Sequence, residues 1–329
     1  MELTTVWFIL IAVLWVGYLV LEGFDFGVGI LSPLLGRNEP ERRAILRTIG
    51  PVWDGNEVWV LVAGGATFAA FPEWYATLFS GFYLPLFLIL LGLILRGVAI
   101  EYRNKRKEPE WRARWDWTIF VGSLLPAVLW GVAFANIVAG VPLDANHEYT
   151  GDLLTLLNPY GLLGGLTTLA LFVTHGAVFL ALKTDGDLRS RANRLAGRVG
   201  LVTAVVAVAF LAWTQLAHGN TASLVASLLA VVAFVGAVGA NRFGREGWAF
   251  AGTAATIALA VVALFVGLFP DVMPSSTSAA YSLTVDNASS TPYTLTIMTW
   301  VAVIFTPVVL LYQGWTYWVF RRRISVETG

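Results

Sequence analysis

The sequence predicts an all-α membrane protein built from long apolar helices. Hydrophobic residues make up 57% of its 329 residues, and charged residues make up only 13%, against about 25% in soluble domains. The mean hydropathy is +0.71. A soluble fold of this size cannot hide so much apolar surface, because much of its surface still faces water. Long uncharged runs exclude a transmembrane β-barrel, whose strands need about ten alternating residues each.

Nine membrane-spanning helices are predicted. A helix needs about 20 residues to cross the hydrocarbon core, and eight uncharged stretches meet that need. A ninth stretch, 58–71, is too short before Pro72, so its span must begin near Val52 and include Asp54 and Glu57. A minimal turn at 218–220 separates two of the others. The predicted spans are 3–21, 52–71, 74–95, 117–143, 153–182, 199–217, 221–241, 247–270 and 295–320.

Basic residues test this count. All Lys and Arg residues except Arg96 fall in alternate connecting segments, namely 22–51, 101–116, 183–198, 241–246 and 321–323. By the positive-inside rule, the N-terminus lies outside and the C-terminus is cytoplasmic. The longest connection, 22–51, is too short to fold alone, so residues 1–329 are expected to form a single polytopic membrane domain.

Charge and cysteine content exclude other classes. The 21 basic residues balance the 21 acidic ones, so the net charge is zero and gives no indication of nucleic-acid binding. The absence of Cys excludes disulfides and iron–sulfur ligation by this chain.

Four acids are expected near the inner leaflet. Glu22 and Asp25 end the first predicted span, and Asp54 and Glu57 open the second, each pair at i, i+3. One connection joins the two spans, so the four acids are expected at similar depth. Buried carboxylates there would take up and release protons, which predicts a proton path through Asp54, Asp25 and Glu57.

Simpler interpretations of these polar residues stay open. Asp54 and Glu57 would also complement a helix dipole, and Glu22 and Asp25 would also be solvated at the interface. Arg96 would pair with one of the acids or extend to the headgroups, the latter being usual for a lone Arg at a helix end. His175 would join a polar relay or make a hydrogen bond in helix packing.

Haem ligands are scarce at membrane depth. Haem iron takes His, Met, Cys or Tyr as axial ligand. Only His175 and Met298 among the His and Met residues are expected inside the membrane, near opposite faces. We therefore expect no haem or other metal bound by this chain alone, and no catalytic residue within it.

Nine strings, in order along the chain, carry a resemblance to a known family. They begin with Gly23-Phe24-Asp25-Phe26-Gly27-Val28-Gly29 and end with Met298-Thr299-Trp300-Val301-Ala302. Between them stand Leu35-Gly36-Arg37-Asn38, Gly50-Pro51-Val52-Trp53-Asp54-Gly55-Asn56-Glu57-Val58-Trp59, Phe79-Ser80-Gly81-Phe82-Tyr83, Trp115-Asp116-Trp117, Gly131-Val132-Ala133-Phe134, Leu157-Asn158-Pro159-Tyr160-Gly161-Leu162-Leu163 and Met273-Pro274-Ser275-Ser276-Thr277. Together these strings resemble subunit II of the cytochrome bd-type quinol oxidases.

The resemblance implies the architecture and the partners. It implies two four-helix bundles plus one peripheral helix, in a heterodimer with a homologous subunit I that holds haem b and haem d. The complex would sit in the bacterial plasma membrane, oxidise quinol and reduce dioxygen to water, generating a membrane potential without pumping protons. A structural quinone and small accessory subunits are also compatible with it.

The resemblance also implies roles for particular residues. The Asp of the Trp-Asp-Gly-Asn string, Asp54, would line a cytoplasmic proton channel shared with subunit I. Asp25 would lie near the same route. Glu57 stands where some family members have an uncharged residue, so its role is ranked below these two.

Two alternative functions remain at this point. One is a stand-alone secondary transporter or ion channel, although such proteins tend to carry polar sites at mid-membrane and repeated halves. The other is a membrane scaffold in which Asp54 has no proton role.

Overall fold

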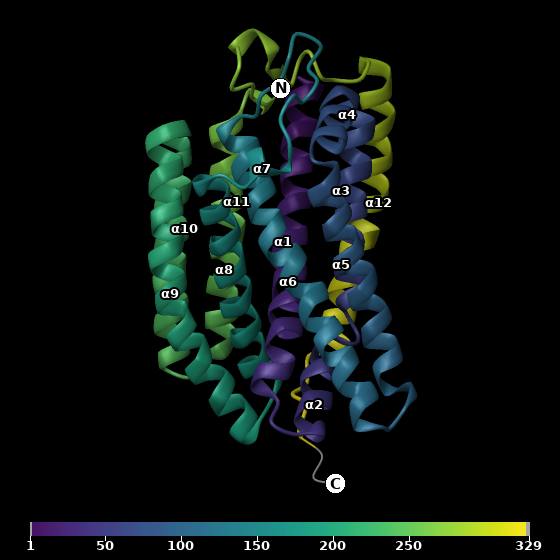
Figure 1. The fold of residues 1–329 in the computed structure, drawn as a ribbon, viewed down its shortest axis with the longest axis vertical. Helices are drawn as coiled ribbons and strands as arrows, with labels where there is room; N and C mark the ends of the chain where they lie inside the picture. The colour runs from purple at the N-terminus through teal and green to yellow at the C-terminus, as the bar shows by residue number, and fades with distance from the viewer. Residues whose placement is uncertain (1, 327–329) are drawn as a thin grey trace.

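The computed structural model describes residues 2–326, and these form a helical bundle (Figure 1). The long helices are α1 (Leu3–Leu35), α3 (Trp53–Ala70), α5 (Tyr83–Tyr102), α6 (Pro109–Ala139), α8 (Pro159–Lys183), α9 (Gly186–His218), α10 (Thr221–Arg242), α11 (Glu246–Leu268) and α12 (Pro292–Val319). The short elements are α2 (Glu39–Ile49), α4 (Pro72–Gly81), η1 (Arg103–Lys105), α7 (Leu153–Leu156), β1 (Asp271–Met273), η2 (Ala279–Tyr281) and β2 (Leu283–Thr284).

Local capping explains where several helices begin. Asn38, Asn158 and Asn220 each precede a helix, and each side chain accepts a hydrogen bond from the backbone N–H three residues later. Asparagine at this position satisfies one of the N–H groups that the first turn leaves unpaired. The 218–220 turn between α9 and α10 therefore lies where the sequence predicts it.

Eight helices within residues 2–326 are long and apolar enough to cross a membrane. They are the long helices named above without α3. The ninth predicted span corresponds to α3, which has 18 residues and carries Asp54 and Glu57. The multi-pass class is thus clear, while the nine-span count stays a prediction.

Several predicted boundaries differ from the observed helices, and two of the differences change where charged residues lie. The first span does not end at Leu21, because α1 continues to Leu35. Residues 22–32 of this helix are all buried. The predicted third span, 74–95, is broken at Phe82 into α4 and α5, and α5 runs on to Tyr102. Arg96 consequently lies in the interior of a helix and not at its end.

Helix α1 is the central element of the bundle. Figure 1 shows it between α9 and α10 on one side and α3, α5 and α12 on the other. It meets α8 through two glycines: a Cβ added to Gly27 would lie 2.1 Å from the Phe172 carbonyl oxygen and 2.8 Å from the Cα of Gly176. The two backbones are therefore in direct contact, as is common where small residues line a membrane helix interface.

Helix α12 is the least buried of the long helices. Leu295 is its one buried residue within the described chain. At its first turns, the indole N–H of Trp7 donates to the Leu295 carbonyl at 3.2 Å and to Thr299 Oγ1 at 3.1 Å. Beyond its other end, Lys183 Nζ donates to the Phe320 carbonyl. Hydrogen bonds therefore hold α12 to the bundle at both ends.

Candidate functional site

Three helices close around a buried group of charged side chains. Glu22 and Asp25 on α1 and Arg96 on α5 are completely buried. The Arg96 guanidinium forms an ion pair with Glu22, and its Nη2 lies 2.8 Å from Oε2 of Glu57 on α3. It also lies 4.8 Å from the ring centroid of Phe26. We name Glu22, Asp25, Glu57 and Arg96 the Arg96 cluster.

The interpretation of Arg96 as a residue that extends to the headgroups is wrong. Its side chain has no exposed area, and it pairs with two acids. The reason is the length of α5, which continues for six residues beyond Arg96, about 9 Å along the helix axis. A guanidinium at that depth needs anionic partners, and Glu22 and Glu57 provide them.

Only three of the four predicted acids lie close together in the structure. Glu22, Asp25 and Glu57 share the Arg96 cluster, whereas Asp54 lies on the outward face of α3 and is exposed. Among the described residues, its carboxylate accepts a hydrogen bond from the backbone N–H of Gly55 at 2.8 Å. Asp54 therefore stands one helical turn from the cluster, at the surface of this chain.

A residue that the sequence analysis missed links the cluster to α12. Asn56 is completely buried, and its Nδ2 donates to Oδ2 of Asp25 at 2.7 Å. Its Oδ1 accepts from Gln313 Nε2 at 3.1 Å and from the Tyr317 hydroxyl at 2.7 Å. The signal was present, since Asn56 lies between Asp54 and Glu57 in a quoted string, but no spacing rule relates residues on three different helices.

His175 lies in the interior of α8, where it makes helix-packing contacts. Its Nδ1 lies 2.6 Å from Thr253 Oγ1 on α11, and its Nε2 lies 3.2 Å from the Val20 carbonyl oxygen on α1. The ring stacks on Phe250 with centroids 4.7 Å apart. Because both ring nitrogens are engaged, the residue does not fit as an axial haem ligand.

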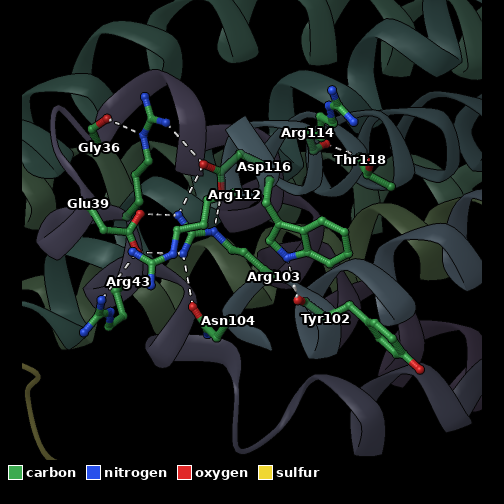
Figure 2. Close-up of polar contacts among 12 residues, drawn as sticks. Gly36, Glu39, Arg43, Tyr102, Arg103, Asn104, Arg112, Arg114, Asp116 and Thr118 are labelled. Carbon is green, nitrogen blue, oxygen red and sulfur yellow. Dashed lines mark hydrogen bonds and ion pairs between the residues drawn. The ribbon is translucent and has the colours of Figure 1, made fainter. Parts of the chain in front are cut away.

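A second charged group lies where α2 meets α5 and α6 (Figure 2). Arg103 is completely buried; its Nε lies 2.5 Å from Asp116 Oδ1, and its Nη2 lies 2.8 Å from Glu39 Oε2. Arg42 also pairs with Asp116 at 3.2 Å, and Arg112 with Glu39 at 3.1 Å. We name these five residues the Arg103 network; it fixes α2 against the ends of α5 and α6.

The Arg103 network perturbs the ionisation of Glu39, which lies outside the apolar spans. Partial burial acts to raise the pKa of this carboxyl. The hydrogen bond and charge of Arg103, together with the charges of Arg112 and Arg43, outweigh that effect and hold the pKa below its ordinary value. Glu39 is therefore ionised at neutral pH and serves as an anchor for α2.

Comparison with known proteins identifies the family. Residues 3–320 match the family described as cytochrome bd terminal oxidase subunit II. The chain is 44% identical to cytochrome bd ubiquinol oxidase subunit 2 of Bacillus subtilis, covering 98% of this chain and 97% of that protein. It is 38% identical to cytochrome bd-I ubiquinol oxidase subunit 2 of Escherichia coli, covering 98% and 95%.

A solved structure shares the fold. The bd oxidase from Geobacillus thermodenitrificans includes a chain that matches with a TM-score of 0.80 at 19% sequence identity, covering 98% of both chains. The fold, the family match over nearly the whole length and the two full-length relatives agree. The chain is a member of the cytochrome bd terminal oxidase subunit II family.

Proposed function

We propose that this chain supports a haem-bearing subunit I and leads protons from the cytoplasm toward it through Asp54, Glu57 and Asp25. As a family member with eight long apolar helices, it is a multi-pass protein of the bacterial plasma membrane and one subunit of a bd-type quinol oxidase. The family match does not favour a stand-alone transporter or channel. The observation that carries the proton proposal is the Arg96 cluster, in which Glu22, Asp25 and Arg96 are completely buried.

The charges of the Arg96 cluster support proton binding. Three carboxylates surround one guanidinium, so a fully ionised cluster would hold two uncompensated negative charges in a buried place. Uncompensated buried charge is costly, and binding protons removes it. A buried group that gains and loses protons is what a proton path requires.

The position of Asp54 supports a path completed by the partner. Asp54 lies at one end of an exposed, mostly apolar stripe on α3, whose Val58, Leu61 and Phe68 are 49%, 68% and 59% exposed. A Cβ added to Gly65, on the same stripe, would meet nothing within 4 Å. Such a face suits the close approach of another membrane helix. Subunit I seated there would cover Asp54 and turn a surface carboxylate into a lining residue.

The finer architecture forms part of the proposal. We place α3 across the membrane as the ninth span, with the first residues of α1 outside and the Arg103 network at the cytoplasmic face. Figure 1 is compatible with this, because α1 begins and α12 ends at opposite ends of the molecule. Residues 1–329 would then form one membrane domain, with α12 as the peripheral helix beside two bundles.

The oxygen chemistry belongs to haem b and haem d, which we assign to subunit I. No group of three or more His, Cys, Asp or Glu side chains able to hold a metal occurs within residues 2–326. When bound in the partner, the haems would pass electrons from quinol to dioxygen. The role of this chain is to hold protons at Asp25 and Glu57 and to keep bulk water away from the buried carboxylates.

The structural quinone implied by the resemblance does not fit one apolar cavity of this chain. That cavity, of about 150 Å³, lies among α1, α6, α8, α9, α10 and α11. Its Thr167 and Thr256 hydroxyls donate to the Leu163 and Gly252 carbonyls of their own helices, so they are not free to bind a quinone carbonyl. The space suits an apolar tail and not a quinone ring.

The test is Asp54→Asn in the assembled oxidase. This change keeps the shape of the side chain and removes its titratable carboxyl group. We expect at least tenfold slower quinol oxidation and slower build-up of membrane potential, with haem content unchanged. Glu110→Gln, at another exposed acid predicted on the cytoplasmic side, is the matched control and should leave both rates as they are. Wild-type rates in Asp54→Asn would leave the scaffold function standing and refute the proton path.

A further inference from the structure

A chain of hydrogen bonds runs from α12 to the buried carboxylate of Asp25. The Trp59 indole N–H donates to Gln313 Oε1 at 2.8 Å, and Gln313 Nε2 donates to Asn56 Oδ1 at 3.1 Å. Tyr317 donates to the same Asn56 oxygen at 2.7 Å. Asn56 Nδ2 then donates to Asp25 Oδ2 at 2.7 Å.

This series of hydrogen bonds fixes which way the Asn56 amide points. An Asn side chain has one accepting oxygen and one donating nitrogen, and rotation by half a turn exchanges them. Trp59 occupies the oxygen of Gln313, so the Gln313 nitrogen faces Asn56. That nitrogen and the Tyr317 hydroxyl both select the oxygen of Asn56. The remaining end of the amide, the nitrogen, is thereby directed at Asp25.

The ionised form of the Asp25 carboxyl group depends on the hydrogen bond from Asn56. Its Oδ1 is buried without a hydrogen-bond partner in the described part of the chain, and its Oδ2 receives the Asn56 N–H. The charged and titratable groups that face it are Glu22 on its own helix, Arg96 on α5, Glu57 on α3 and Tyr317 on α12. In the described chain, the one hydrogen bond given to Asp25 comes from Asn56, so the amide favours the ionised carboxylate.

We propose that Asn56 is a positioning residue for Asp25, and that Gln313 and Tyr317 of the peripheral helix α12 hold its amide in the orientation that stabilises the carboxylate. This inference deepens the proposed proton path and rests on it for its functional meaning. Because α12 has so little buried surface, its position is set largely by polar contacts such as these. A shift of α12 would release the Asn56 amide and change how firmly Asp25 holds its proton.

The test follows the Asp25 carboxyl group by infrared difference spectroscopy on the assembled oxidase during a pH titration. The C=O band that disappears in Asp25→Asn is assigned to Asp25. In Tyr317→Phe combined with Gln313→Leu, we expect the midpoint of that band to move to higher pH by about one unit, the size expected for loss of a hydrogen bond to a charged group. Tyr312→Phe removes a hydroxyl from the exposed side of the same helix and should leave the midpoint unchanged.

A double-mutant cycle separates the specific linkage from general loosening of α12. In an Asn56→Leu background, the Asp25 band should already be shifted, and adding Tyr317→Phe should move it no further. A wild-type midpoint in the Tyr317→Phe, Gln313→Leu variant would overturn the proposal. An equal shift on adding Tyr317→Phe with and without Asn56 would also overturn it.

The same samples distinguish this inference from the proton path. Quinol oxidation by Asp25→Asn reports whether Asp25 conducts protons at all. Normal turnover in Asp25→Asn with the predicted band shifts in the α12 variants would reject a proton role for Asp25 and keep the positioning role of Asn56. Slow turnover in Asp25→Asn with unshifted bands in the α12 variants would keep the proton role of Asp25 and reject the positioning role of Asn56.

Discussion

Arg96 and Glu22 form an ion pair in which neither side chain has any exposed area. Glu57 is the second partner of the same guanidinium and is 23% exposed. The pair thus connects the interior of α1 and α5 to a carboxylate on α3 that lies partly at the surface. In a buried site, removing one partner of such a pair costs more free energy than the pair contributes to stability, because the remaining charge is left without a partner.

Replacing Arg96 by Met should prevent stable assembly. The change leaves Glu22 and Glu57 without a counter-charge, which costs about 3–5 kcal/mol when the remaining partner stays ionised in a buried site. We expect a large loss of assembled oxidase in membranes and a lower thermal midpoint for the fraction that assembles, measured by haem absorbance and thermal denaturation. Arg194→Met, at an exposed Arg of α9, should assemble normally. Normal assembly and thermal midpoint in Arg96→Met would show that the ion pair is dispensable.

Acidification should loosen α2. The pKa of Glu39 is held below its ordinary value of 4.5 by Arg103, Arg112 and Arg43 against the effect of burial. A lowered folded-state pKa contributes stability that is fully present above about pH 4.5 and is lost as pH falls through the lowered value. Because the chain has no Cys, a spin label on a single Gly50→Cys can report α2 mobility, which should rise below pH 4.5.

Glu39→Gln provides the control for the acid response of α2. In this variant, the labelled helix should be more mobile at neutral pH and should respond less to acid. Asp152→Asn, at an acid in a distant loop, should behave as wild type. Identical titration curves for Glu39→Gln and wild type would assign the acid response to another group.

Adding a methyl group at Gly27 should disrupt the centre of the bundle. The new Cβ would lie 2.1 Å from the Phe172 carbonyl oxygen, so α1 and α8 would have to separate by more than roughly 1 Å to restore contact distance. We expect Gly27→Ala to lower the yield of assembled oxidase severalfold, measured by size-exclusion chromatography in mild detergent. Gly236→Ala on α10 meets nothing within 4 Å and should assemble as wild type. Equal yields from the two variants would contradict the close contact of α1 and α8.

The sequence predicts the helices better than it predicts the contacts among them. The class follows from composition, and the turn before α10 follows from Asn220, whose capping role is local. The break at Phe82 escapes prediction because the whole 74–95 stretch is uncharged. It coincides with a tertiary contact, since a Cβ on Gly81 would lie 2.6 Å from the Cβ of Tyr149.

The candidate site shows the same division. Glu22, Asp25 and Glu57 stand out in the sequence because charge inside a span needs a reason, and the structure brings them together. The sequence leaves Arg96 either paired with one of the acids or extended to the headgroups, because the predicted third span ends beside it. Helix α5 runs seven residues beyond that predicted end, so the structure selects the pairing. Asn56 is neither charged nor regularly spaced from its partners, so only the packing of α1, α3 and α12 reveals its position.

The backbone contact between Gly27 and Gly176 has a consequence for motion. Where two helices touch through side chains, rotamer changes let them slide or tilt by small steps. At this contact no side chain lies between α1 and α8, so we expect the two helices to move together. Helix α12 is the opposite case, since polar contacts that can break and re-form hold it at the edge. Any conformational change during turnover is therefore expected to displace α12 while the α1–α8 pair stays still as the fixed frame.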